Sequence, residues 1–250
     1  MGVCKLCGVN GKLVDAHIIP KAFHRHMQTD RNRPLTVTAT KSNEPPKRNP
    51  GGLYDREMLC ELCEPRFGDW DQYGAECLIQ RFEQDAVPII LSNGNVTAYQ
   101  IDKWDEKKLR MFALSVLWRA AVTSHERFAS VSLGPHEPRL RQLILDGDPG
   151  SPYDFAVTYS RWRSESGNEQ WTRAQMDPMR FKVEGVNTVH MFFGGGIVGI
   201  KCDQRPVPAA WREAVLSPYG PVKFVSLAFE TNPFFGILMD GRRRLTSKAR

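Results

Sequence analysis

The sequence lacks any long apolar run. No stretch of about 18 consecutive apolar residues occurs in its 250 residues, so a transmembrane helix is not predicted. The first residues also lack the charged and then apolar leader of an exported protein. Hydrophobic residues make up 41% of the chain and charged residues 25%, which excludes a disordered or collagen-like chain. We therefore expect a soluble, cytoplasmic protein without a membrane partner.

Cysteine is scarce, and four of the six cysteines fall in two C-x-x-C pairs. Cys4 and Cys7 form the first pair, and Cys60 and Cys63 form the second. In a reducing compartment this pattern is typical of metal ligation and not of disulfides. Four thiolates fill the tetrahedral shell of a structural zinc ion, so we predict one Zn2+ bound by all four. The alternative is a thiol redox pair, but no βαβ pattern surrounds either motif.

Acidic residues are few in the first fifth of the chain. Residues 1–50 contain nine Lys and Arg residues against three Asp and Glu residues, a surplus equal to the net charge of +6 of the whole chain. Clustered cations favour polyanions, because neutralised phosphates release their counterions. The alternative is a solvated basic face. The predicted nucleic-acid contacts are Lys21, Arg25, Arg31, Arg33, Lys47 and Arg48.

Local patterns predict the elements around the cysteine pairs. Residues 12–19 are rich in β-branched and apolar side chains, which indicates a short strand that carries His17. Residues 28–52 combine proline and glycine with basic residues and are predicted to form a long exposed loop. Apolar residues recur at helical spacing over residues 64–82 and predict a helix that begins at the second cysteine pair.

The central part of the chain is predicted to be helical. An apolar stripe over residues 105–129 predicts the central core helix, and we assign Trp118 and Arg119 on it to the core. A further helix is predicted over residues 138–145. It ends at the Gly/Pro-rich segment 146–150, which is the predicted domain boundary.

The last hundred residues have a β-rich pattern, with a glycine turn at residues 194–196. The predicted fold class is α+β, with a zinc-bound N-terminal part, central helices and a small C-terminal sheet. The predicted strands lie at residues 155–159, 181–183, 189–193, 197–202 and 222–228. The predicted domains are a zinc-bound domain at 1–85, a helical core or linking region at 86–150 and a β-rich domain at 151–250.

The segment between the cysteine pairs contains a second motif. His17 is followed by two residues and then by Pro20, between one C-x-x-C pair and a helix that begins at the other. In the order and spacing of these features, residues 4–82 resemble the HNH, or ββα-metal (His-Me finger), endonucleases. The resemblance implies a ββα-metal finger that hydrolyses phosphodiester bonds. It also implies that His17 is the general base that activates a water molecule.

The resemblance further implies one catalytic divalent ion, and this sequence departs from the family at the positions that bind it. Ala16 stands before His17, where the family has Asp or His. Asp55 occupies the position of the family's loop asparagine, and Glu64 stands where a histidine is common. Carboxylates suit Mg2+ or Mn2+, so Asp15, Asp55 and Glu64 are the predicted ligands, with Asp55 also predicted to be catalytic.

Two functions from different classes follow. The first is a metal-dependent endonuclease of a bacterium or phage, active on double-stranded DNA and used in defence. The second is a non-catalytic zinc-knuckle module that binds nucleic acid or a protein, which the alanine at position 16 favours. The β-rich part is expected to recognise the substrate, to form a homodimer or to sense a signal, and its sequence leaves these three open.

Overall fold

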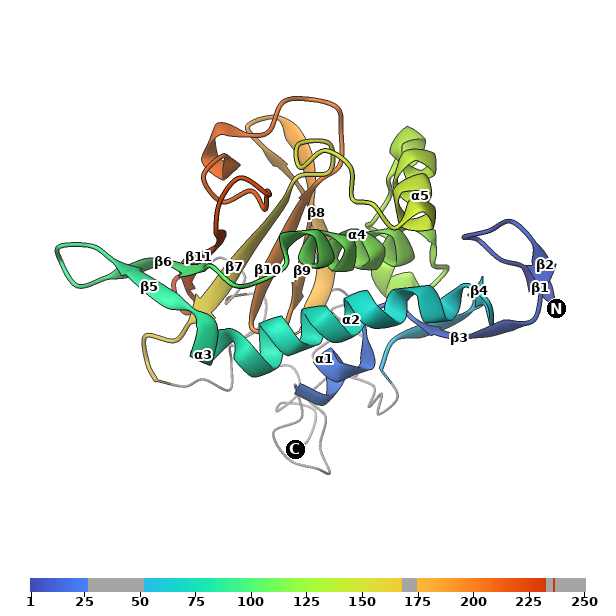
Figure 1. Ribbon diagram of the computed structural model, residues 1–250, viewed down its shortest axis with the longest axis horizontal. Helices are drawn as coiled ribbons and strands as arrows, with labels where there is room; N and C mark the ends of the chain where they lie inside the picture. The colour runs from blue at the N-terminus through green and yellow to red at the C-terminus, as the bar shows by residue number, and fades with distance from the viewer. Residues whose placement is uncertain (27–51, 168–174, 233–235, 237–250) are drawn as a thin grey trace.

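The computed structural model of the chain describes residues 1–26, 52–167, 175–232 and 236. A seven-stranded sheet lies behind the long helices, and two short hairpins lie at the N-terminal end of the molecule (Figure 1). None of the helices in these residues has the length and apolar composition that a membrane crossing requires. The mixed α and β content agrees with the predicted fold class.

The N-terminal part contains two antiparallel hairpins. β1 (Gly2–Val3) pairs with β2 (Asn10–Gly11), and the first cysteine pair lies in the turn between them. β3 (Leu13–His17) pairs with β4 (Tyr54–Cys60). The short helix α1 (Lys21–His26) follows β3. The predicted strand that carries His17 is therefore confirmed.

A continuous helical run begins directly after Cys63 and confirms the helix predicted there. It contains a π-helical turn over residues 76–81. Gly74 allows close packing, because a Cβ atom there would lie 2.5 Å from the ring of Phe112. The segments of the run are η1 (Glu64–Phe67), α2 (Gly68–Ala75), η2 (Glu76–Arg81) and α3 (Phe82–Asp85).

The central helix α4 (Glu106–Val122) is almost entirely buried. It starts at Asp105, whose side chain accepts a hydrogen bond from an N–H of the first turn, as an N-cap residue does. The helix ends at Thr123, which has an extended backbone. It is therefore shorter than predicted, because the residues after Thr123 turn away to contact β4.

A loop with two short 3-10 helices, η3 (Glu126–Phe128) and η4 (Gly134–His136), connects α4 to α5 (Glu137–Asp146). Gly147 ends α5 with a φ of +65°, a left-handed conformation that favours glycine. The third predicted helix and its glycine stop are confirmed.

The sheet has the strand order β5-β6-β11-β7-β10-β9-β8, and all neighbours are antiparallel except β11 and β7. The five strands predicted from the C-terminal sequence are all present. The seven strands of the sheet are β5 (Val87–Ile90), β6 (Val96–Ile101), β7 (Val157–Arg163), β8 (Met176–Val183), β9 (Val186–Phe193), β10 (Gly196–Lys201) and β11 (Val222–Ala228).

The sheet is wider than predicted, because the β5–β6 hairpin belongs to the segment 86–150 that was expected to be helical. β6 pairs with β11 and so joins this segment to the C-terminal part. One cluster of buried apolar side chains extends from Cys4 to Phe224 and runs through all three predicted domains. The division into three domains remains a prediction.

Candidate functional site

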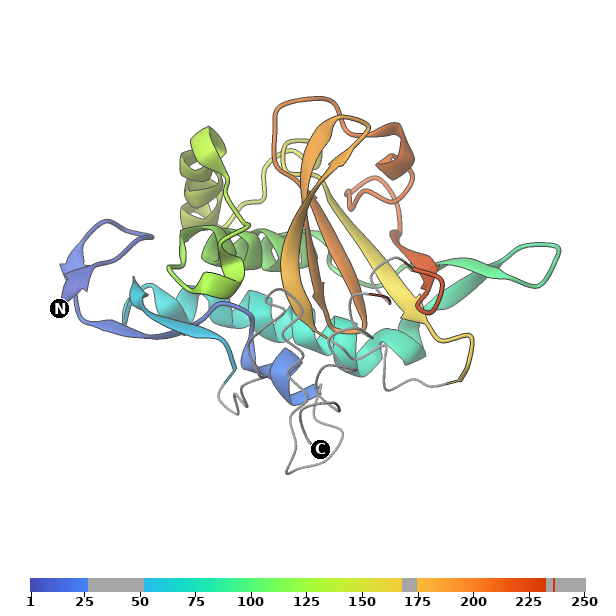
Figure 2. The same cartoon turned by 180° about the vertical axis from the view of Figure 1, so that it is seen from behind.

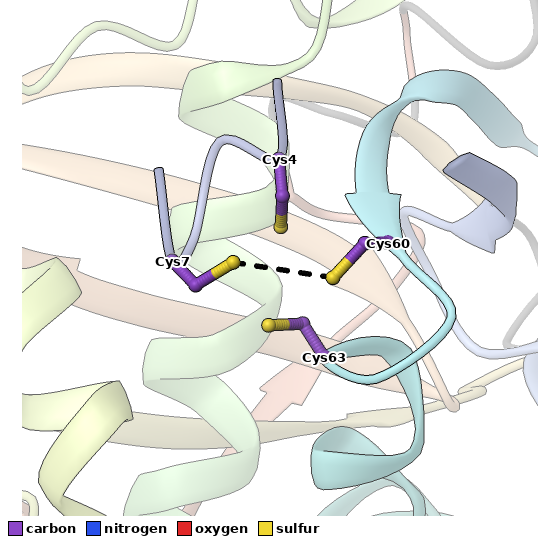
Figure 3. Close-up of side chains that lie close together, drawn as sticks. All are labelled: Cys4, Cys7, Cys60 and Cys63. Carbon is purple, nitrogen blue, oxygen red and sulfur yellow. Dashed lines mark hydrogen bonds between the residues drawn. The ribbon is translucent and has the colours of Figure 1, made fainter. Parts of the chain in front are cut away.

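The four paired cysteines meet at one point, although about 50 residues separate the two pairs in the chain. Figure 3 shows the four sulfur atoms directed toward one another from the β1–β2 turn, the end of β4 and the start of η1. All four lie within 4.8 Å of one another, and Sγ of Cys7 lies 3.9 Å from Sγ of Cys60. A tetrahedral zinc with Zn–S bonds of about 2.3 Å requires sulfur separations of about 3.8 Å. The group can therefore hold a metal ion such as zinc.

Backbone geometry prepares the first cysteine pair for a metal. Gly8 has a φ of +76°, and its N–H donates to the carbonyl oxygen of Cys4 at 2.8 Å, which closes a tight turn. Burial alone would raise the pKa of Cys4, but hydrogen bonds from the backbone N–H groups of Cys7, Cys60 and Leu6 outweigh it and lower this pKa to about 7. Metals bind the thiolate form, so these amides favour ligation.

Within the described residues, this is the only group of three or more His, Cys, Asp or Glu side chains placed to hold a metal ion. The predicted second set, Asp15, Asp55 and Glu64, does not form such a group. Glu64 is half-buried at the first position of η1, where a carboxylate interacts favourably with the helix dipole.

His17 lies on the outer face of the β3–β4 hairpin, where it is partly exposed. It is paired with Tyr54, and the two ring centroids are 6.3 Å apart. The guanidinium group of Arg56 lies over the Tyr54 ring at 5.4 Å and donates a hydrogen bond of 3.0 Å from Nε to Asp15. The outer face thus carries an imidazole, a phenol, a guanidinium and a carboxylate in a row. The predicted ligand Asp15 shares the face of His17 but forms an ion pair with Arg56.

Asp55 lies on the opposite face of the hairpin. It pairs with Ala16, and both side chains are buried against the end of α4. Its carboxylate accepts hydrogen bonds from the Thr123 hydroxyl at 2.6 Å, from the Ser124 N–H at 3.1 Å and from the Glu57 N–H at 2.7 Å. Burial raises the pKa of Asp55, but these donors outweigh burial and keep it below its usual value. Its observed contacts fasten the hairpin to α4.

Asp71, on α2 seven residues after Glu64, also has a protein partner. Its carboxylate forms a bidentate ion pair with the buried Arg119 of α4, at 2.6 and 2.8 Å. The same guanidinium donates a 2.9 Å hydrogen bond to the carbonyl oxygen of His17 and lies 4.8 Å from the ring centre of Phe67. Arg119 therefore fixes the position of the strand end that carries His17.

The predicted nucleic-acid contacts are only partly within the described residues. Lys21 and Arg25 are exposed on α1, four residues apart and hence on one face of the helix. This basic face follows β3 directly along the chain. The remaining predicted contacts, Arg31, Arg33, Lys47 and Arg48, lie outside the described residues.

His24 of α1 holds the open ends of the hairpin together. Its Nε2 accepts a hydrogen bond of 3.1 Å from the N–H of Leu53, and it is also hydrogen-bonded to the backbone of Ile19. Burial lowers the pKa of His24 to about 4, and unfavourable electrostatic interactions of its protonated form with His17 and Arg127 contribute. The imidazole is therefore neutral at pH 7 and has a structural role.

Because the folded pKa of His24 lies below its unfolded value of about 6.5, the unfolded state binds more protons between these two values. The resulting stabilisation is complete above pH 6.5 and is lost as the pH falls toward 4. We expect the free energy of unfolding to decrease by up to about 3 kcal/mol over this range from this residue alone. Urea unfolding of the parent and of His24→Gln at pH 7 and pH 5 measures the difference.

The variant and the parent have the same cysteine group. The difference between them in how the free energy of unfolding changes from pH 7 to pH 5 therefore isolates the contribution of His24. His136→Gln, which removes an imidazole outside the hairpin, controls for the loss of one histidine. Equal slopes for the parent and for His24→Gln would contradict the assignment.

Several residues of this site carried no recognisable signal in the sequence. Tyr54 and Arg56 reach the face of His17 only through the strand register, and Thr123 and Ser124 reach Asp55 only because α4 ends there. Arg119 is buried in the core, as predicted. Its ion pair with Asp71 could not be predicted, because it depends on the packing of α2 on α4. Comparison with protein families, with curated proteins and with solved structures finds no match to this chain.

Proposed function

We propose that this protein is an endonuclease of the HNH type that hydrolyses phosphodiester bonds in double-stranded DNA. One observation supports it above the others. His17 lies on the outer face of an antiparallel hairpin, and a helix begins directly after the four-cysteine group that fastens the other end of this hairpin. Strand, strand and helix follow in the order that the family resemblance implies.

The chemistry of the proposal rests on His17 as the general base. A neutral imidazole can accept a proton from a water molecule that attacks the phosphorus atom. Zinc at the four cysteines has a structural role, because four thiolates leave no open position for a substrate or water. Arg56 belongs to β4, and the exposed Lys21 and Arg25 belong to the helix that follows β3, so the hairpin and α1 both contribute cations that suit the negative charge of a phosphate backbone.

The oxygen ligands predicted for Mg2+ or Mn2+ do not fit one ion. Asp15 and Asp55 lie on opposite faces of the hairpin, and each has a protein partner. We therefore assign no ligands to a second ion and derive no step of the reaction from it. Plasmid nicking measured with and without Mg2+ or Mn2+ determines whether cleavage requires a divalent ion.

The same observations favour a second candidate, a zinc-knuckle module that binds nucleic acid without cleaving it. Ala16 cannot bind a metal. Asp15 and Asp55 of the hairpin and Asp71 of α2 all form hydrogen bonds or ion pairs with other side chains. A module of this kind would shift DNA in a gel, less strongly as the salt concentration rises, with no cleavage in Mg2+, Mn2+, Ni2+ or Zn2+.

Replacing His17 with alanine is expected to reduce plasmid nicking by at least about 100-fold, because loss of a general base typically costs this factor or more. Nicking of supercoiled plasmid is measured with the purified parent and variant in Mg2+ and in Mn2+. Zinc content and the thermal unfolding midpoint should stay close to those of the parent, because the His17 side chain is partly exposed.

His136→Ala, in η4 and outside the hairpin, is the matched control and should cut as the parent does. A His17→Ala variant that nicks as well as the parent would refute the role of His17. A parent that binds DNA with a normal salt dependence but cuts in none of the metals would favour the binding module.

A further inference from the structure

The seven-stranded sheet has a second face, which is directed away from α4 and toward the viewer in Figure 2. A cavity of about 300 Å³ opens on this face. The strand register places Thr158 of β7, His190 of β9 and Gly199 of β10 side by side in its floor. Phe181 of β8 and Trp211 of η6 (Ala209–Trp211) line it as well.

Three rings follow one another along this cavity. The Phe181 and His190 ring centres are 4.8 Å apart, and those of His190 and Trp211 are 5.9 Å apart. Gly199 permits this arrangement, because a Cβ atom there would lie 2.8 Å from Oγ1 of Thr158 and 3.1 Å from the Trp211 ring. The Phe181 and His190 rings are tilted by 50° to each other and the His190 and Trp211 rings by 38°, so a flat ligand can stack on one of these rings while the other two contact its edge.

His190 contributes a neutral ring to this cavity. Burial lowers its pKa to about 4, and its Nε2 lies 3.3 Å from Oγ1 of Thr188. Its Nδ1 is buried and has no hydrogen-bond partner among the residues that the structure describes. The imidazole therefore carries no charge at pH 7 and does not require a counter-ion in the cavity.

The charge of the lining narrows the class of ligand. No Asp or Glu is present among the described lining residues, and Lys182 supplies their only charge. A cationic ligand is therefore disfavoured, whereas a neutral ring or a ring that carries an anion is not. Ser160 and Thr158 contribute hydroxyl groups beside the rings. The volume lies at the lower end of the range for small-molecule sites, about 300 to 1,000 Å³.

We propose that this cavity binds one nucleobase, stacked on Phe181 and bordered by His190 and Trp211, as part of a nucleotide. A nucleotide combines a flat heteroaromatic ring with ribose hydroxyl groups and an anion. The base can belong to a free mononucleotide or to a single strand of nucleic acid, since both present the same ring. The proposal does not depend on the nuclease activity, because none of the described residues that line the cavity belongs to the β3–β4 hairpin that carries His17.

The test is isothermal titration calorimetry of the full chain with AMP, GMP, CMP, UMP and a short single-stranded oligonucleotide. Ribose 5-phosphate, which lacks the base, is the ligand control and should give no saturable binding. Phe181→Ala should weaken binding by about tenfold or more, because stacking of one base on an aromatic side chain contributes about 1–3 kcal/mol. Phe181→Trp retains a ring and should restore binding.

Tyr219→Ala removes an aromatic ring that is 79% exposed outside the cavity and should bind as the parent does. Binding of a mononucleotide that depends on Phe181 would identify a small-molecule site, and binding of the oligonucleotide alone would identify the strand as the source of the base. The proposal is overturned if neither binds, if Phe181→Ala binds as the parent does, or if ribose 5-phosphate binds equally well.

Discussion

A Cys63→Ser variant is expected to lose its metal ion and the folded state of the N-terminal hairpins. The β1–β2 hairpin is short, and Cys4 and Leu6 are its only buried residues. Metal binding and folding are therefore coupled, as in small zinc domains, where the ion supplies about 10–16 kcal/mol. Because most members of the buried apolar cluster lie after residue 85, mainly in α4 and the sheet, we expect a loss of about 5 kcal/mol or more whose largest effect is on residues 1–85.

Zinc content by mass spectrometry of the native protein and hydrogen exchange of residues 1–26 and 52–85 measure this effect. The parent should hold one zinc ion, and a chelator should reproduce the change in exchange seen in the variant. Cys77→Ser removes a buried thiol outside the group and is the matched control, which should retain the ion. A Cys63→Ser variant with the zinc content of the parent would refute the site. A parent without metal that forms a reversible Cys4–Cys7 disulfide would instead indicate a redox protein.

The elements that the sequence predicted are those with a strong local signal. The apolar stripe of α4, the Gly147 stop of α5 and the turn at residues 194–196 each depend on residues close together in the chain. The cysteine group was also predictable, although its pairs are far apart, because two such motifs in one segment are typical of one shared metal ion.

The features that the sequence did not predict depend on contacts between distant segments. The β5–β6 hairpin has a local signal, Asn93-Gly94 between apolar residues, but its place in the sheet follows from pairing with β11. Asp55 was predicted as a ligand from its distance to Cys60 along the chain. A register shift between Val14 and Ala16 decides which face of the hairpin it occupies. No local pattern encodes that shift.

An Asp71→Ala variant is expected to lower the free energy of unfolding by about 3–5 kcal/mol, because it leaves the charge of Arg119 buried without its carboxylate. The pair is bidentate, at 2.6 and 2.8 Å, and Arg119 is 2% exposed. Urea unfolding measures the loss. The double variant Asp71→Ala/Arg119→Met should be less destabilised than the single one, because no unpaired charge remains.

The exposed pair of Asp15 and Arg56 is the matched control. Its side chains are 59% and 69% exposed, so Asp15→Ala should cost less than about 1 kcal/mol. If Asp71→Ala were as stable as Asp15→Ala, the buried pair would not stabilise the fold. Arg119 also donates to the carbonyl oxygen of His17, so loss of Asp71 should reduce nicking at temperatures where the variant remains folded. A stable Asp71→Ala variant with full activity would show that this pair neither supports the core nor positions the strand end that carries His17.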